Sequence, residues 1–145
     1  MVDRSSGIYG FFKEFRFLSN FYLCEVHYEG LVYPNAESAY QAAKTLDKNL
    51  RSYYTNPSMS PAAVRRAGQS LNIRPDWDSV KLEVMREINL DKFSRHEELR
   101  HALLMTDDFY LEETNTWGDR FWGVCEGEGE NNLGKILMEI RKELR

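Results

Sequence analysis

Four polar side chains recur at helical spacing along one stretch of the chain: Glu37, Tyr40, Gln41 and Lys44. At about 100° per residue they would share one face of a helix. One interpretation is a solvated face, with Glu37 favourably placed near the helix N-terminus. The other is the wall of a binding site. In that case the helix dipole would hold Glu37 ionised, as a general base or a stabiliser of positive charge requires.

A second helix-like stretch places Lys81 inside an apolar stripe formed by Trp77, Val84 and Ile88. Lysine is seldom fully buried without a partner. Its side chain either extends along the apolar surface to reach water or points its ammonium group into a pocket. In a pocket it would hold a phosphate or a carboxylate, or act as a desolvated nucleophile.

The densest aromatic cluster is the segment 117–123, in which Asp119 lies between Trp117 and Trp122. Aromatic residues in a loop commonly anchor that loop to the core. A carboxylate beside an aromatic ring also suits a nucleobase that stacks on the ring while its polar edge is recognised nearby. The glycines of segment 127–131 precede an expected helix, which is a weak indication of a phosphate-binding turn.

Other chemistries find little support in the sequence. His27, His96 and His101 lack the spacing of a zinc site. Cys24 and Cys125 form no CxxC pair, and two widely separated cysteines are typical of a reducing compartment. No GxSxG motif is present. We therefore predict no metal and no organic cofactor.

Length and composition indicate one globular domain spanning residues 1–145. The chain is 42% hydrophobic and 29% charged, with a formal net charge of −4. This charge argues against a broad nucleic-acid-binding surface. No apolar run approaches the roughly 18 residues of a membrane span, and the first seven residues do not resemble a signal peptide. We expect a cytoplasmic protein without a membrane segment.

The elements expected to position these side chains are strands first and helices afterwards. The fold class predicted is α+β, mostly helical, with a small N-terminal β-sheet. Strands are expected at 15–18 and 22–28, the latter forming a hairpin with 31–33. Helices are expected at about 36–54, 61–67, 77–93, 95–105 and 132–144. Their expected N-caps are Asn35, Ser60, Asp76, Ser94 (in an S-x-x-E capping box) and Asn131 or Asn132.

In order, these segments resemble the YbiA-like or NADAR family, over about residues 15–141. The matching blocks are Phe17-Leu18-Ser19-Asn20-Phe21-Tyr22, then Gly30, Tyr33-Pro34, Glu37, Tyr40-Gln41-Ala42 and Lys44, then Ser60-Pro61, Arg66-Ala67-Gly68, Arg74, Asp76-Trp77, Lys81 and Met85, then Lys92-Phe93, Leu103-Leu104, Thr106, Leu111 and Glu113, and finally Asp119-Arg120-Phe121-Trp122-Gly123 and Gly127, Gly129, Asn131 and Leu133-Gly134-Lys135. Each block is weak alone, but their common order and spacing make the resemblance specific.

The resemblance implies an N-glycosidase that hydrolyses a ribose C1–nitrogen bond. It associates two substrate classes with the family: phosphoribosylamino intermediates of riboflavin synthesis, and ADP-ribose attached to guanine. Glu37, Trp77, Asp119 and Trp122 match positions that the family uses for activity. The sequence departs from its relatives at Ser38 and Ala39, where they often carry His and an aromatic residue, so the substrate stays open.

Two mechanisms are compatible with these residues. In the first, Glu37 stabilises an oxocarbenium-like state and activates water, while Asp119 orients the sugar or assists the leaving base. In the second, Lys44 or Lys81 attacks C1 and forms a Schiff base with the opened ribose. The residues expected to bind substrate are Asn20, Tyr40, Trp77, Lys81, Trp122 and Asn131. The alternative class is a module that binds ADP-ribose or a nucleotide without turnover, which would need the aromatic and basic residues but not Glu37.

Overall fold

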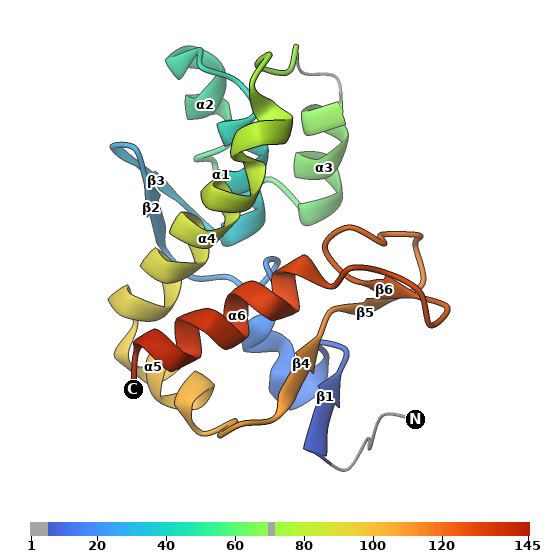
Figure 1. Ribbon diagram of the computed structural model, residues 1–145. Coiled ribbons are helices and arrows are strands. Elements are labelled where there is room, and N and C mark those ends of the chain that lie inside the picture. Colours follow the sequence, from blue (N-terminus) through green and yellow to red (C-terminus); the bar gives the residue numbers. More distant parts are fainter. Residues whose placement is uncertain (1–5, 70–71) are drawn as a thin grey trace. The chain divides into compact units, whose positions relative to one another are not determined.

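The computed structural model describes residues 6–69 and 72–145, which form two compact units (Figure 1). Unit 1 combines the N-terminal residues through Ser19 with His96–Arg145, and unit 2 is the continuous segment Asn20–Arg95. Both contain helices and short strands, so the predicted α+β class is confirmed.

A β-hairpin opens unit 2. Strands β2 (Val26–Tyr28) and β3 (Leu31–Tyr33) pair in antiparallel fashion. The turn between them places Glu29 and Gly30 at φ angles of 43° and 87°. Two successive residues with positive φ are typical of the tight turns that join twisted strands. The predicted hairpin is therefore confirmed, although its first strand begins at Val26 rather than near Tyr22.

Four helices complete unit 2: α1 (Ala36–Ala43), α2 (Lys48–Tyr53), α3 (Pro61–Gln69) and α4 (Trp77–Arg95). Helix α1 packs against the other three helices and against both strands of the hairpin (Figure 1). All eight residues of α1 are buried. The polar side chains of a helix surrounded in this way depend on partners within the unit, because little water reaches them.

The single helix predicted over 36–54 is wrong, because the chain breaks between Ala43 and Lys48. The Asp47 side chain accepts hydrogen bonds from the backbone N–H groups of Asn49 and Leu50, and so starts α2. At the end of α1, the carbonyl of Lys44 accepts from the N–H of Arg74 at 2.8 Å. A continuous helix would place Ala39, Ala43, Leu46 and Leu50 on one apolar face; Ala39 and Ala43 are buried in α1, whereas Leu46 and Leu50 lie beyond the break and are exposed.

Several predicted helix ends are confirmed. The Asn35 side chain accepts from the N–H of Ser38 at 2.8 Å, and the Ser60 hydroxyl accepts from the N–H of Ala63 at 3.1 Å. The predicted capping box at Ser94 is wrong. Helix α4 continues through Arg95, whose guanidinium pairs with Asp91 one turn earlier at 2.9 Å.

In unit 1, two segments distant in sequence form a parallel strand pair. Strand β1 (Gly7–Tyr9) lies beside β4 (Tyr110–Glu112), with Ile8 opposite Leu111, and both of these residues are buried. The strand predicted at 15–18 is wrong, because this segment belongs to a 3₁₀ helix, η2 (Lys13–Leu18). A short apolar run fits either conformation, and here burial of Leu18 is achieved by the helical turn.

The remaining elements of unit 1 are α5 (Glu97–Leu104), β5 (Thr114–Asn115), β6 (Val124–Cys125) and α6 (Asn132–Glu143). Strands β5 and β6 pair in parallel and close the loop between them. Leu133, Ile136, Leu137, Ile140 and Leu144 recur in the sequence at the spacing of one helix face; the first four are buried in the structure and Leu144 is half-buried. In the described part of the chain, no helix is both long and apolar enough to cross a membrane.

Helix α4 also buries a lysine that the sequence did not single out. Lys92 is 0% exposed, and its Nζ lies 5.0 Å from the ring centroid of Phe93 and 5.6 Å from that of Tyr22. Burial lowers the pKa of Lys92 from 10.5 to about 8, with a smaller opposing effect from Cys24. The folded state therefore disfavours the charged form of this residue.

Lys92→Met is expected to raise the free energy of unfolding at neutral pH and to flatten its pH dependence. Between about pH 8 and 10.5 the unfolded lysine still binds a proton that the folded lysine has released. Wild-type stability therefore rises with pH across this window, by a total on the order of 1–3 kcal/mol. Urea unfolding at several pH values measures the effect. The exposed Lys135→Met is the control, and equal pH slopes in wild type and Lys92→Met would contradict the prediction.

Candidate active site

Glu37 lies in the first turn of α1 and is only 8% exposed. Its backbone N–H donates to the carbonyl of Asn20 at 3.0 Å, and its Oε1 accepts from the Nε2 of Gln41 at 2.7 Å. The interpretation of this helix face as solvated is therefore wrong. A carboxylate at a helix N-terminus is favoured by the positive end of the helix dipole. Glu37 is thus a buried hydrogen-bond acceptor with a fixed orientation.

Lys44 is the C-cap residue of the same helix and is half-buried. Its Nζ lies 5.4 Å from the ring centroid of Tyr40. Burial lowers the pKa of Lys44, the charges of Arg65 and Lys81 lower it further, and the negative charge of Glu37 acts in the opposite direction. The charges of Glu37, Arg65 and Lys81 therefore all act on Lys44, although these residues come from three different helices.

Tyr40 and Trp77 form the aromatic part of this cluster. Their ring centroids are 5.2 Å apart with an interplanar angle of 54°, and both residues are buried. Tilted contacts of this kind stabilise aromatic pairs beyond simple burial. The two predicted binding residues thus hold each other in place, one from α1 and one from the first turn of α4.

Two further predicted binding residues occupy the edges of the same unit. The Nζ of Lys81 lies 3.2 Å from Asp78 Oδ1, so its ammonium group reaches the unit's surface along the apolar face. The side chain of Asn20 is buried against α4. There its Oδ1 accepts from Asn89 at 3.4 Å, and its Nδ2 lies 3.3 Å from the sulfur of Met85. Their roles in substrate binding stay predictions.

The sequence reasoning missed Arg65 of α3. Its guanidinium carbon lies 5.9 Å from the ring centroid of Phe21, and its charge acts on Lys44. A signal was available, because Val64 and Gly68 are one helical turn apart and mark the buried side of α3. Arg65 is three residues before Gly68, so it lies at the edge of that side.

In unit 1, Asp119 is held by an extended set of backbone bonds. Its Oδ1 accepts from the N–H groups of Phe121 at 3.2 Å and Trp122 at 2.9 Å. The buried side chain of Asn115 accepts from the N–H of Asp119 and donates to its carbonyl, at 3.0 and 2.8 Å. The Oδ1 atom of Asp119 therefore stabilises the loop that contains it. The Oδ2 atom is the one with which Asp119 could act on a ligand.

The other two predicted residues of unit 1, Trp122 and Asn131, differ in their exposure and in the contacts of their side chains. Trp122 is half-buried and meets Phe121 edge-on, with ring centroids 4.7 Å apart. Asn131 is buried. Its side chain accepts from the N–H of Glu113 at 3.0 Å and donates to the carbonyl of Leu111 at 2.9 Å. Both of its polar atoms therefore bond to the backbone around β4 and hold that strand, and its role in substrate binding stays a prediction.

The predicted site residues fall into both units. Unit 2 contains Asn20, Glu37, Tyr40, Lys44, Trp77 and Lys81, whereas unit 1 contains Asp119, Trp122 and Asn131. Contacts link Tyr40 to Trp77 and to Lys44 within unit 2, and Asp119 to Trp122 within unit 1.

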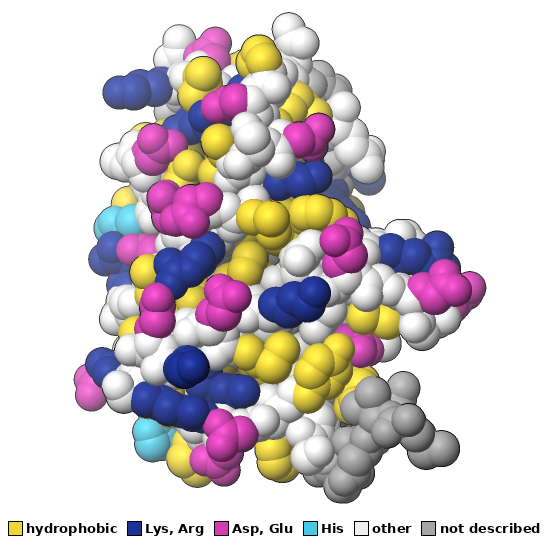
Figure 2. All heavy atoms as spheres, in the orientation of Figure 1, with side chains coloured by type: hydrophobic (Ala, Val, Ile, Leu, Met, Phe, Trp, Pro, Cys, Tyr) yellow, Lys and Arg dark blue, Asp and Glu magenta, His cyan; other side chains and the backbone are white. Residues whose placement is uncertain are grey.

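Two surface properties complete the description. Within the described ranges, no group of three or more His, Cys, Asp or Glu side chains could hold a metal ion. Figure 2 shows basic and acidic side chains interspersed on the face that it presents.

Asp119→Asn and Asp119→Ala are expected to separate the structural role of this residue from a chemical one. Asparagine retains the Oδ1 acceptor, so the loop and the stability should be preserved, whereas alanine should cost about 1 kcal/mol. If the charge acts on the substrate, both variants should lose roughly 10²-fold in turnover. Thermal unfolding and a turnover assay measure the two effects. Wild-type turnover by Asp119→Asn would mean that the carboxylate serves only the loop.

The structure defines a small α+β protein whose central helix carries a buried glutamate. A family model described as NADAR domain matches residues 6–145. The chain therefore belongs to the NADAR domain family, as its sequence blocks predicted.

Relatives and a solved structure agree with this assignment. The N-glycosidase YbiA of Escherichia coli (strain K12) is 37% identical over 147 residues, covering 99% of this chain and 91% of that protein. An N-glycosidase of Nostoc punctiforme is 35% identical over 132 residues, covering 88% and 84%. The NMR structure of E. coli YbiA matches with a TM-score of 0.82 at 36% identity, over 95% of this chain and 83% of that one.

A riboflavin biosynthesis protein of Vibrio vulnificus is 38% identical over 131 residues, covering 89% of this chain. The match covers 35% of the Vibrio protein, so the chain corresponds to about a third of that relative's length.

Proposed function

We propose that this protein is an N-glycosidase that hydrolyses a ribose C1–nitrogen bond. The observation that carries the proposal is the buried Glu37 carboxylate, bonded to Gln41 at 2.7 Å and close enough to Lys44 to affect its pKa. A binding module would have no need of an acceptor buried in this way. The relatives named N-glycosidases, which match along most of the chain, support the same activity.

In the water mechanism, Glu37 faces the positive charge that develops at C1 as the bond to the base breaks. A carboxylate held at a helix start stabilises that charge and can accept a proton from the attacking water. Tyr40 and Trp77 would then flank the nucleoside, and Asp119 would orient the sugar or assist the leaving base.

In the covalent mechanism, a lysine amine attacks C1 and expels the base, which leaves with a proton. The sugar ring of this adduct opens to give a Schiff base, and water hydrolyses the Schiff base to release the phosphate-bearing sugar and the original amine. Between the two lysines, the structure favours Lys44 for this role. Burial and two neighbouring cations lower its pKa, whereas Lys81 is paired with Asp78. A lower pKa leaves more neutral amine at neutral pH.

We further propose that the substrate carries a phosphate. The charges of Arg65 on α3 and Lys81 on α4 both act on Lys44 of α1, and cations that act on one position in this way suit a phosphate group. Both classes of substrate implied by the sequence, a phosphoribosylaminopyrimidine and ADP-ribosylated guanine, meet this requirement. The riboflavin-related relative favours the first class.

The decisive experiment is incubation of the purified protein with each substrate class, followed by mass spectrometry of the products. We expect release of the free base from at least one of them. Binding of both without release, measured by calorimetry, would replace the enzyme with a nucleotide-binding module.

A further inference from the structure

Gln41 and Glu37 lie one turn apart on α1, and their side chains are joined by a hydrogen bond of 2.7 Å. An ionised carboxylate only accepts hydrogen bonds, so the amide nitrogen of Gln41 must be the atom that faces it. The amide oxygen, Oε1, therefore points the other way. It is buried and has no hydrogen-bond partner among the described residues. The orientation of this amide is thus set by Glu37 and not by a bond to Oε1.

Gly68 of α3 lies against the opposite side of the same amide. A Cβ atom at this position would overlap Oε1 of Gln41 and crowd its carbonyl carbon. Glycine is a poor helix residue, and Gly68 has an ordinary negative φ, so its backbone conformation does not explain its presence inside α3. Space for the Gln41 amide does explain it.

We propose that Gln41 is a positioning residue that aims and holds the Glu37 carboxylate, and that Gly68 leaves the space in which the Gln41 amide can do so. The inference rests on the proposed function only for the statement that Glu37 acts on a substrate. The arrangement itself depends on one hydrogen bond and one close helix contact.

The arrangement has two physical effects on Glu37. A donated hydrogen bond favours the ionised carboxylate over the neutral acid, and it restricts the side-chain rotamer so that Oε2 stays directed away from Gln41. Other charges that act in this part of unit 2 are those of Lys44, Arg65 and Lys81 on α1, α3 and α4. Lys44, Arg65 and Lys81 are unchanged in every variant of the test. A change in the pKa of Glu37 is therefore attributed to the loss or displacement of the Gln41 amide.

The test compares Gln41→Met, Gln41→Ala, Gly68→Ala and the double variant Gln41→Ala/Gly68→Ala, with Gln69→Ala as the control for changes in α3. Gln69 is exposed and adjacent to Gly68. NMR titration of the Glu37 carboxyl group and the pH profile of kcat/KM are measured for each. We expect Gln41→Met and Gly68→Ala to move the Glu37 titration and the acid limb of the profile to higher pH, and to lower kcat at least tenfold. Gln69→Ala should match wild type.

The double variant isolates the connection between the two residues. Once the amide is gone, a methyl group at position 68 has nothing to displace, so Gly68→Ala should cause no further loss in the Gln41→Ala background. An equal loss in both backgrounds would mean that Gly68 acts only through its own helix. If Gln41→Ala does not fold, the Glu37 titration in Gln41→Met and Gly68→Ala is sufficient to test the positioning role of Gln41.

An unchanged Glu37 titration in Gln41→Met would overturn the positioning role. The NMR titration requires no substrate, so it decides this inference even if the wild type shows no turnover and the proposed function fails.

Discussion

Glu37→Gln is expected to lower kcat by roughly 10²- to 10⁴-fold, the usual cost of losing a general base. Glutamine has the same length as glutamate and keeps an oxygen that can accept from Gln41, so α1 should remain folded. Substrate affinity should stay within a few-fold, because the aromatic and basic residues of unit 2 are unchanged. Steady-state kinetics and calorimetric binding to the same protein samples measure the two quantities.

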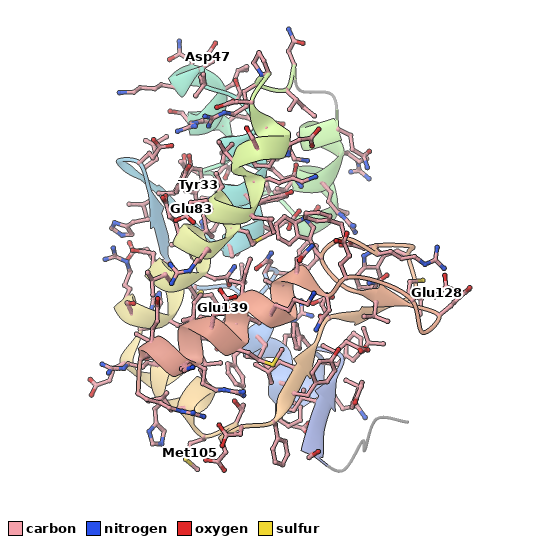
Figure 3. The ribbon with its side chains drawn as sticks, viewed as in Figure 1. Tyr33, Asp47, Glu83, Met105, Glu128 and Glu139 are labelled. Carbon is pink, nitrogen blue, oxygen red and sulfur yellow. The ribbon has the colours of Figure 1, made fainter. Side chains whose placement is uncertain are left out.

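The matched control is Glu83→Gln, the same chemical change at an exposed position of α4 (Figure 3). It should leave both kcat and affinity unaltered. Full turnover by Glu37→Gln would exclude the carboxylate mechanism. Loss of affinity equal to the loss of turnover would place Glu37 in substrate binding instead of chemistry.

Lys44→Met should distinguish the water mechanism from the covalent mechanism. Under the covalent mechanism, its loss of kcat should be comparable to that of Glu37→Gln. If Lys44 is the nucleophile, kcat should fall by at least roughly 10³-fold, and borohydride should trap a ribose adduct on the wild type but not on the variant. If Lys44 holds a phosphate, KM should rise while kcat is largely kept. Lys48→Met, at an exposed position of α2, is the control.

The pH dependence gives an independent measure of the same mechanism. Attack requires the neutral amine, so kcat should rise with pH as Lys44 loses its proton. Because burial lowers the pKa of Lys44, this rise should be complete at a lower pH than for an ordinary lysine. Absence of a trapped adduct, together with a kcat that Lys44→Met retains, would discard the Schiff base.

Local signals in the sequence predicted a large part of the fold. Asn35 and Ser60 are caps whose side chains bond to backbone three residues ahead, and such bonds depend on neighbouring residues alone. The stripe of α6 was equally visible, because its period fixes one buried face. Helical spacing also placed Glu37 and Lys44 on one face, and in the structure the charge of Glu37 acts on Lys44.

Features that depend on contacts between residues distant in the sequence could not be predicted from local patterns. The end of α1 depends on the N–H of Arg74, thirty positions after Lys44, so helical periodicity alone extended that helix too far. Arg65 gains its importance from Phe21 and Lys44, which no local pattern connects to it. Asp119 was singled out for its charge, yet one of its oxygens is used to shape its own loop.

The pairing of β1 with β4 has a consequence for the order in which the chain folds during synthesis. Unit 2 is continuous, so all of its residues have been made once Arg95 has been added. Strand β1 can pair only after Tyr110–Glu112 have been made, about a hundred residues later, and α6 is made after that. Contacts between such distant segments form slowly, because a long loop must be closed first. Unit 2 therefore leaves the ribosome before the partner strand of β1 does, so the helices around Glu37 can assemble first.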